Sequence, residues 1–136
     1  MGKPRLHPSA ASRADATAMV SAIVRRVRRR ALVVLLTDLN ATAIEEGLLP
    51  VLTQLSARHQ VIIAAVADPR VNQLAVRRTD AAAVYDAAAA ERSRNDRLAI
   101  ASRLRHRGAE VVDAAPADLA PALADRYLAM KATGRL

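Results

Sequence analysis

The sequence predicts an α/β fold with three αβα layers, in which helices cover both faces of a short parallel sheet of about three strands. Three apolar segments, ALVVLLT, QVIIAAVA and AEVVDA, have the length and the apolar content of buried strands. Segments with helical periodicity lie between them, and strands that alternate with helices form parallel sheets through right-handed crossovers. The 136 residues suit one domain, expected at 13–136 after a flexible tail at 1–12.

The first half of the chain is expected to contain two helices and two strands. The first helix begins near Ser12, and its apolar stripe consists of Met19, Val20, Ile23, Val24 and Val27. The strand at 31–37 follows, and its almost continuous apolar content predicts burial on both faces. A second helix has its apolar residues at Ile44, Leu48, Val51, Leu52 and Leu55. Gly47 and Pro50 interrupt it, so regular geometry is expected only from about Leu49, before the strand at 60–67.

The second half is expected to contain helices on both sides of one further strand. Asp68 followed by Pro69 predicts the start of a short helix, PRVNQLAV. A long alanine-rich helix, capped by Thr79 or Asp80, should then extend to about Arg107, because Gly108 suits the position after a helix end. The last helix, after the strand AEVVDA, should open at Pro116 and end at Gly134, with the stripe Leu119, Leu123, Tyr127 and Met130.

Composition limits the function classes. The chain has no cysteine, which excludes disulfides and thiolate chemistry. The N-terminal segment lacks the apolar region of a signal peptide. The apolar runs are far shorter than the ~20 residues of a membrane helix. We therefore expect a cytoplasmic protein without membrane insertion.

The formal charge of +8 suggests an anionic partner, and the basic residues are most concentrated in RRVRRR. This cluster consists of Arg25, Arg26, Arg28, Arg29 and Arg30. The favoured interpretation is a solvated helix end, where cations suit the helix dipole. The alternative is a nucleic-acid surface, which the absence of nearby aromatic stacking residues makes the weaker interpretation.

No enzyme motif is present. The four glycines form no phosphate-binding loop, and there is no nucleophile elbow. His59 and His106 fall at predicted helix ends, on the opposite edge of the sheet from Asp38, and are interpreted as helix-end cations. We therefore expect no catalytic residue and no resident cofactor.

Three aspartates follow the predicted strands. Asp38, Asp68 and Asp113 should share one edge, because the carboxyl ends of parallel strands meet there. Carboxylates so arranged are the type of ligand that Mg²⁺ prefers. Aspartate is also favoured in turns and caps, and this second interpretation is preferred for all three residues.

Three stretches resemble a bacterial family: RRVRRRALVVLLTDLN, LLPVLTQLSARHQVIIAAVADP and GAEVVDAAPADLAPALADRYLAMKATGRL. The family is that of domain of unknown function 58, whose C-terminal part is a von Willebrand factor A-like domain often encoded beside MoxR-type AAA+ ATPases. The resemblance implies that the three strands match the last three of a doubly wound sheet. Asp38 matches the last aspartate of a metal-ion-dependent adhesion site. The Asp-x-Ser-x-Ser loop of that site has no match here, so any Mg²⁺ would bind weakly at an incomplete site.

The same resemblance implies that the strand at 31–37 has lost its neighbour on one side. An exposed apolar edge of this kind requires a covering partner. We expect a homodimer or a partner chain at this strand and at the carboxyl edge, through Leu32, Val33, Val34, Leu35, Thr37, Asp38 and Asn40. The predicted function is a non-enzymatic interaction or scaffold module, with an AAA+ ATPase as a candidate partner. A basic nucleic-acid-binding protein and a gene fragment without function are the alternatives.

Overall fold

The structure is a computed structural model that describes residues 8–66 and 81–136. Its elements, in chain order, are α1 (Pro8–Arg26), β1 (Leu32–Thr37), α2 (Ala41–Ala43), the π-helical turn η1 (Ile44–Leu48), α3 (Leu49–Ser56), β2 (Gln60–Val66), α5 (Ala81–His106), β3 (Glu110–Ala114) and α6 (Pro116–Ala132). The helix predicted from Pro69, the caps at Thr79 or Asp80, and Asp68 itself lie outside the described residues.

The three strands form one parallel sheet in the spatial order β1-β2-β3, as predicted. β1 pairs with β2 from Leu32 opposite Gln60 onwards, and β2 pairs with β3 from Ile62 opposite Glu110 onwards. Among the described residues β1 pairs with no other strand, so β1 is one edge of the sheet and β3 is the other.

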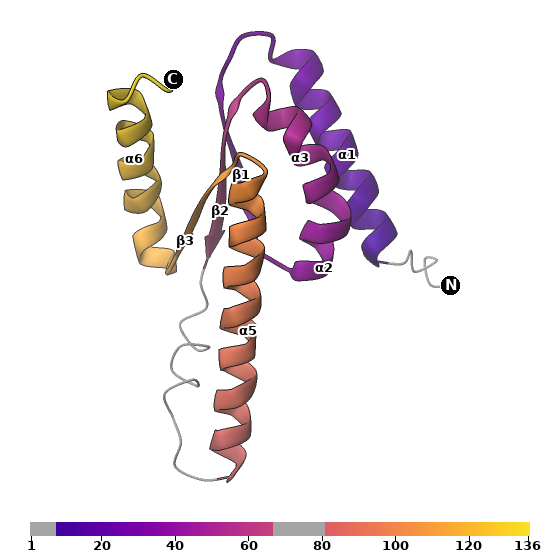
Figure 1. Ribbon diagram of the computed structural model, residues 1–136, viewed down its shortest axis with the longest axis vertical. Helices are drawn as coiled ribbons and strands as arrows, with labels where there is room; N and C mark the ends of the chain where they lie inside the picture. Colours follow the sequence, from indigo (N-terminus) through magenta and orange to yellow (C-terminus); the bar gives the residue numbers. More distant parts are fainter. Residues whose placement is uncertain (1–7, 67–80) are drawn as a thin grey trace.

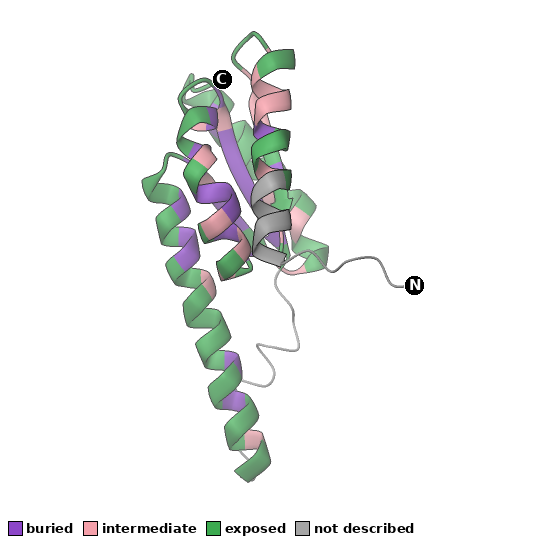
Figure 2. Cartoon of the chain, turned by 90° about the vertical axis from the view of Figure 1, so that its right-hand side faces the viewer, coloured by how far each residue is buried: buried purple, intermediate pink, exposed green. Residues whose placement is uncertain are grey.

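Helices lie on both faces, which confirms the three-layer architecture (Figure 1). One face carries α1, α3 and α5, and the other carries α6 (Figures 1 and 2). α6 packs against β2 and β3, so it covers only part of its face. α5 extends well past the carboxyl end of the sheet (Figure 1).

One helix start differs from the predictions and another agrees with them. α1 begins at Pro8, so the helix enters the segment predicted to be a tail. Proline suits this first position, because it has no N–H and that N–H would have no partner within the helix. The second helix is regular only from Leu49, as predicted, and the turn before it is π-helical. Pro50 cannot donate the α-helical hydrogen bond to the carbonyl of Glu46, which favours the wider turn at this point.

In the described part of the chain, the core consists of two clusters, one on each face of the sheet. The larger cluster lies on the α1 and α3 side and includes Leu35, Leu52, Leu55, Ile63 and Leu104. The smaller cluster joins Ile62 and Val112 to Met130 of α6, with Leu119, Ala122 and Leu123 packed against it. The predicted stripe of α6 is wrong at Tyr127, which is 40% exposed, and Ala122 packs in the cluster instead. Among the described helices, none has the length and apolar character needed to cross a membrane.

Candidate functional site

The turn after β1 is held by its own polar side chains. The hydroxyl of Thr37 accepts the N–H of Leu39 at 3.2 Å, and the Asp38 carboxylate accepts the N–H of Asn40 at 3.1 Å. Asn40 caps α2 by accepting the N–H of Ala43 at 3.1 Å. Leu39 adopts a left-handed conformation with a φ of 56°, and its buried side chain anchors the turn in the core. Asp38 is therefore a turn residue in this structure, which agrees with the preferred interpretation of its role.

Arg97 of α5 holds the carboxyl ends of all three strands together. Its Nη1 donates to the carbonyl of Asp38 at 2.8 Å, and its Nη2 donates to the carbonyl of Val66 at 3.3 Å. The same guanidinium forms a two-point pair with Asp113, through Nη2 at 2.7 Å and Nε at 3.2 Å. The edge at which aspartates were expected to gather thus carries a cation of the chain itself.

The sequence analysis did not single out Arg97, which directly follows the polar run ERSRND in the middle of the long helix. Residues 91–96, which form that run, are exposed, whereas Arg97 is partly buried. A signal for this was present. Arg97 lies seven residues after the buried Ala90 and seven before the buried Leu104, which places it on the inward face of the helix.

A Mg²⁺ site at Asp38 stays a prediction of the sequence analysis. Asp113 lies at the same edge as Asp38, but Arg97 contacts both, through the carboxylate of the first and the carbonyl of the second. Among the residues that the structure describes, no three acidic, histidine or cysteine side chains are grouped as a metal site would require. Asp68 lies outside those residues.

β1 is covered on one face only, so the prediction of burial on both faces is wrong. Leu35 is buried on the α1 side, whereas Val34 and Leu36 on the other face are 42% and 75% exposed. The reason is the placement of α6, which packs over β2 and β3 and reaches only Leu32 of β1. The same strand therefore has both an open hydrogen-bonding edge and an uncovered apolar face.

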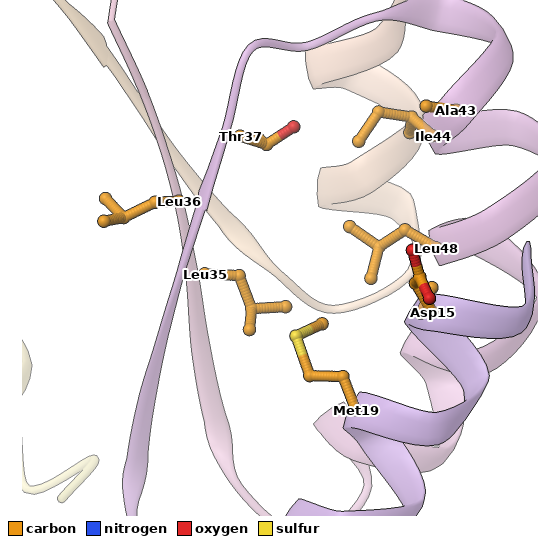
Figure 3. Close-up of a pocket in the computed structure, with 9 residues that line it drawn as sticks. Asp15, Met19, Leu35, Leu36, Thr37, Ala43, Ile44 and Leu48 are labelled. Carbon is orange, nitrogen blue, oxygen red and sulfur yellow. The ribbon is translucent and has the colours of Figure 1, made fainter. Parts of the chain in front are cut away.

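A groove of about 270 Å³ runs along the free edge of β1, between this strand, α1 and the η1 turn. Met19 and Leu35 point into it from opposite sides, whereas Leu36 points away (Figure 3). Its lining is mainly apolar, with Asp15 and Thr37 as polar members. The groove gives an incoming strand room for side chains on the α1 side.

The predicted interaction residues fall into two groups. Val34, Asp38 and Asn40 are exposed, whereas Leu32, Val33 and Thr37 are partly buried and Leu35 is buried. The prediction left out Leu36, the most exposed of the apolar residues in β1. Strict alternation along the strand, with Val34 outward, would have identified it.

The basic cluster lies at the amino edge of the sheet, opposite the Asp38 turn. Arg25 and Arg26 end α1, and Arg28, Arg29 and Arg30 form the connection to β1. All five are exposed, and the Nε of Arg25 donates to the carbonyl of Ser21 at 3.3 Å. This arrangement fits a solvated helix end and leaves the cluster accessible to an anionic partner.

His59 makes a structural contact that the sequence analysis did not predict. Its ring is 3% exposed, and its Nδ1 accepts the N–H of Ala31 at 3.1 Å. The ring thus joins the residue before β1 to the residue before β2. His106, the last residue of α5, is exposed, with its Nδ1 3.2 Å from the carbonyl of Ser102.

Comparison of the chain with protein-family models, with curated proteins and with solved structures gives no match.

Proposed function

We propose that this chain is a non-enzymatic interaction module that binds another polypeptide through the free edge of β1. The proposal rests on one observation: the same strand has an unpaired hydrogen-bonding edge and exposed apolar side chains. Within residues 8–66 and 81–136, β1 pairs with a strand on one side only, and its Val34 and Leu36 are exposed. Edge strands of soluble proteins are usually protected by charge, proline or a covering element, since an open apolar edge recruits other strands.

A binding role also suits the carboxyl edge, where ligands of parallel α/β folds usually bind. The donors of Arg97 are directed at Asp113 and at two backbone carbonyls. This group therefore stabilises the ends of the strands, and it is not placed to activate a substrate. The exposed Asp38 and Asn40 beside it would extend the contact surface of β1 around its carboxyl end.

The resemblance to a von Willebrand factor A-like domain supplies a class of partner. In such a fold another strand would lie beside β1, so a second polypeptide would restore a missing neighbour. We propose a scaffold role in the cytoplasm, with an AAA+ ATPase of the MoxR type as one candidate for the larger assembly. A weakly bound Mg²⁺ at Asp38 belongs to the same proposal. In calorimetry, titration of the wild type with Mg²⁺ should release or absorb heat, and Asp38→Ala should not. If neither protein gives a heat of binding, the proposed Mg²⁺ site is wrong.

The test of the edge is Val34→Pro, which removes one outward N–H. Proline is tolerated on the open side of an edge strand, so the fold should survive. Light scattering should show concentration-dependent association of the wild type at micromolar concentration and a monomeric variant. Val34→Thr keeps both the N–H and the β-branched shape and serves as the matched control. A stable, soluble wild-type monomer would count against self-association, and association that Val34→Pro leaves unchanged would overturn the proposed role of this edge.

The exposure of all five arginines of the cluster supports nucleic-acid binding as a second candidate. Each phosphate neutralised should add about 0.9 to the slope of log affinity against log salt. Binding to duplex or single-stranded DNA should therefore weaken steeply with salt and be lost in Arg28→Ala/Arg29→Ala/Arg30→Ala. Absent or salt-independent binding would exclude this candidate.

A further inference from the structure

The direction of the backbone groups of β1 follows from its contacts with β2. The carbonyl of Ala31 accepts the N–H of Gln60 at 3.0 Å, and the N–H of Ala31 donates to His59 on the same side. Successive residues of a strand turn their N–H and C=O groups to opposite sides. The residues at 33, 35 and 37 therefore face β2, and Leu32, Val34 and Leu36 present theirs to the free edge.

We propose that the partner at this edge is a second copy of the chain, whose β1 pairs antiparallel with the first about a two-fold axis through Val34. The result is a continuous sheet with three strands from each copy. This inference rests on the proposed function and adds to it the identity of the partner and the register of the pairing.

Symmetry restricts the register. A two-fold axis that relates antiparallel neighbours is perpendicular to the sheet, so each face of one copy continues into the same face of the other. With the axis at Val34, Leu32 pairs with Leu36 of the second copy, and Val34 pairs with its own counterpart. All three outward residues then exchange hydrogen bonds within the strand. An axis at Val33 or at Leu35 leaves one of them opposite a residue outside the strand.

The charges next to the strand favour the same register. Counting outward from Val34 places Arg30 of one copy opposite Asp38 of the other, and the symmetry repeats this pair. Both residues are exposed in the single chain. Each copy carries a formal charge of +8, and parallel pairing in register would place the two arginine clusters side by side. Antiparallel pairing separates the clusters to opposite ends and gives each an acidic neighbour.

The apolar surfaces also match. On the α1 side, Val33 of the second copy lies opposite Leu35, at the groove that Leu35 and Met19 line (Figure 3). On the other face, the exposed Leu36 gains Leu32 of the second copy as its neighbour, and the exposed Val34 gains its own counterpart. Apolar residues therefore meet apolar residues from Leu32 to Leu36.

Disulfide trapping tests the register. The chain has no cysteine, so Val34→Cys provides one thiol per copy. Residues opposite each other in a hydrogen-bonded antiparallel pair have Cα atoms about 5.5 Å apart, within disulfide range. With diamide as oxidant, Val34→Cys should form a covalent dimer. Leu32→Cys and Leu36→Cys should each cross-link poorly alone and efficiently when mixed. A different pattern would overturn the register.

Charge reversal tests the Arg30–Asp38 pair. Arg30→Asp or Asp38→Arg alone should raise the dissociation constant of the dimer roughly tenfold, because two attractions become repulsions. An equal mixture of the two variants should assemble more tightly than either alone, since both pairs in the mixed dimer are again of opposite sign. Sedimentation equilibrium measures all three cases.

The outcomes separate this inference from the proposed function. If Val34→Pro abolishes association but the trapping pattern and the mixed rescue fail, the edge function stands and the register is wrong. If the mixed variants associate no better than the single ones, the Arg30–Asp38 pair is wrong. If the wild type is monomeric, the pairing of two copies is wrong, and the proposed function then requires a different polypeptide at this edge.

Discussion

At the scale of single residues, Arg97 has the largest structural role that the contacts identify. Its pair with Asp113 is only partly shielded from solvent, with side-chain exposures of 21% and 32%. Arg97→Ala would leave two strand-end carbonyls and a carboxylate without this donor. We expect a loss of about 2 kcal/mol in the free energy of unfolding, measured by urea denaturation.

Arg94→Ala is the matched control, because Arg94 lies one turn earlier on α5 and is exposed. Its effect should stay within about 0.5 kcal/mol. Arg97→Lys should recover only part of the loss, since lysine keeps the charge but lacks the planar fork. Equal stabilities for the Arg97 and Arg94 variants would show that the contacts of Arg97 contribute little.

His59 gives a second prediction at this scale. His59→Ala removes the acceptor of the Ala31 N–H and leaves a cavity, so a loss of about 2–3 kcal/mol is expected. His106→Ala removes an exposed ring and should change stability by less than about 0.5 kcal/mol. Thermal unfolding of the two variants side by side checks this, and similar midpoints would contradict a structural role for His59.

Residue roles were predictable where they depend on local chemistry. Asp38 and Asn40 belong to residue types that favour turns and caps, and both act in this way. The contacts of Arg97 and His59 join segments far apart in the chain. Arg97 meets a residue 59 positions away, and His59 meets one 28 positions away. Local sequence pattern carries little information about such contacts.

At the scale of elements, Gly108 has the clearest predicted effect. It follows α5 with a φ of 93°, and a Cβ there would lie 3.1 Å from the Oγ of Ser56. Gly108→Ala therefore adds crowding to backbone strain, and a loss of about 2 kcal/mol is expected. Gly134, with a φ of 72°, has open space around it, so Gly134→Ala should cost only about 1 kcal/mol. Urea titrations should give this order, and the reverse order would contradict the explanation.

The strands were the most predictable elements, because short apolar runs between helical segments are typical of parallel sheets. All three appear in the predicted places and order. The burial of β1 was not predictable in this way, since coverage of a strand depends on what packs on it. An apolar composition cannot distinguish a strand covered on two faces from one that awaits a partner.

At the scale of the whole molecule, α6 covers one face of the sheet over β2 and β3, and the described residues leave most of that face of β1 uncovered. Glu110 at the start of β3 pairs with Arg126 and Arg135 of the C-terminal segment, which anchors α6 over the β3 side. On the same face of the sheet, Val34 and Leu36 of β1 are exposed. The uncovered apolar face is therefore concentrated on β1, and the proposed binding surface rests on this feature.

Hydrogen exchange offers a prediction for the assembled molecule. In a dilute sample, the outward amides of Leu32, Val34 and Leu36 should exchange fast, whereas those at 33, 35 and 37 should be protected by β2. As concentration rises, only the outward amides should slow, in proportion to the fraction of free edges. The exchange rates of the outward amides should fall about tenfold once nine-tenths of the edges are paired.

The alternation itself is the informative feature of this experiment. Non-specific aggregation would protect the apolar face of β1 without regard to which way each amide points. Pairing with another strand protects every second residue, because only those N–H groups meet acceptors across the interface. Arg30→Asp at the same concentration should weaken the alternation, since it lowers the dimer population without altering β1 itself. Uniform protection along the strand, or protection that does not depend on concentration, would be incompatible with a reversible edge-to-edge dimer.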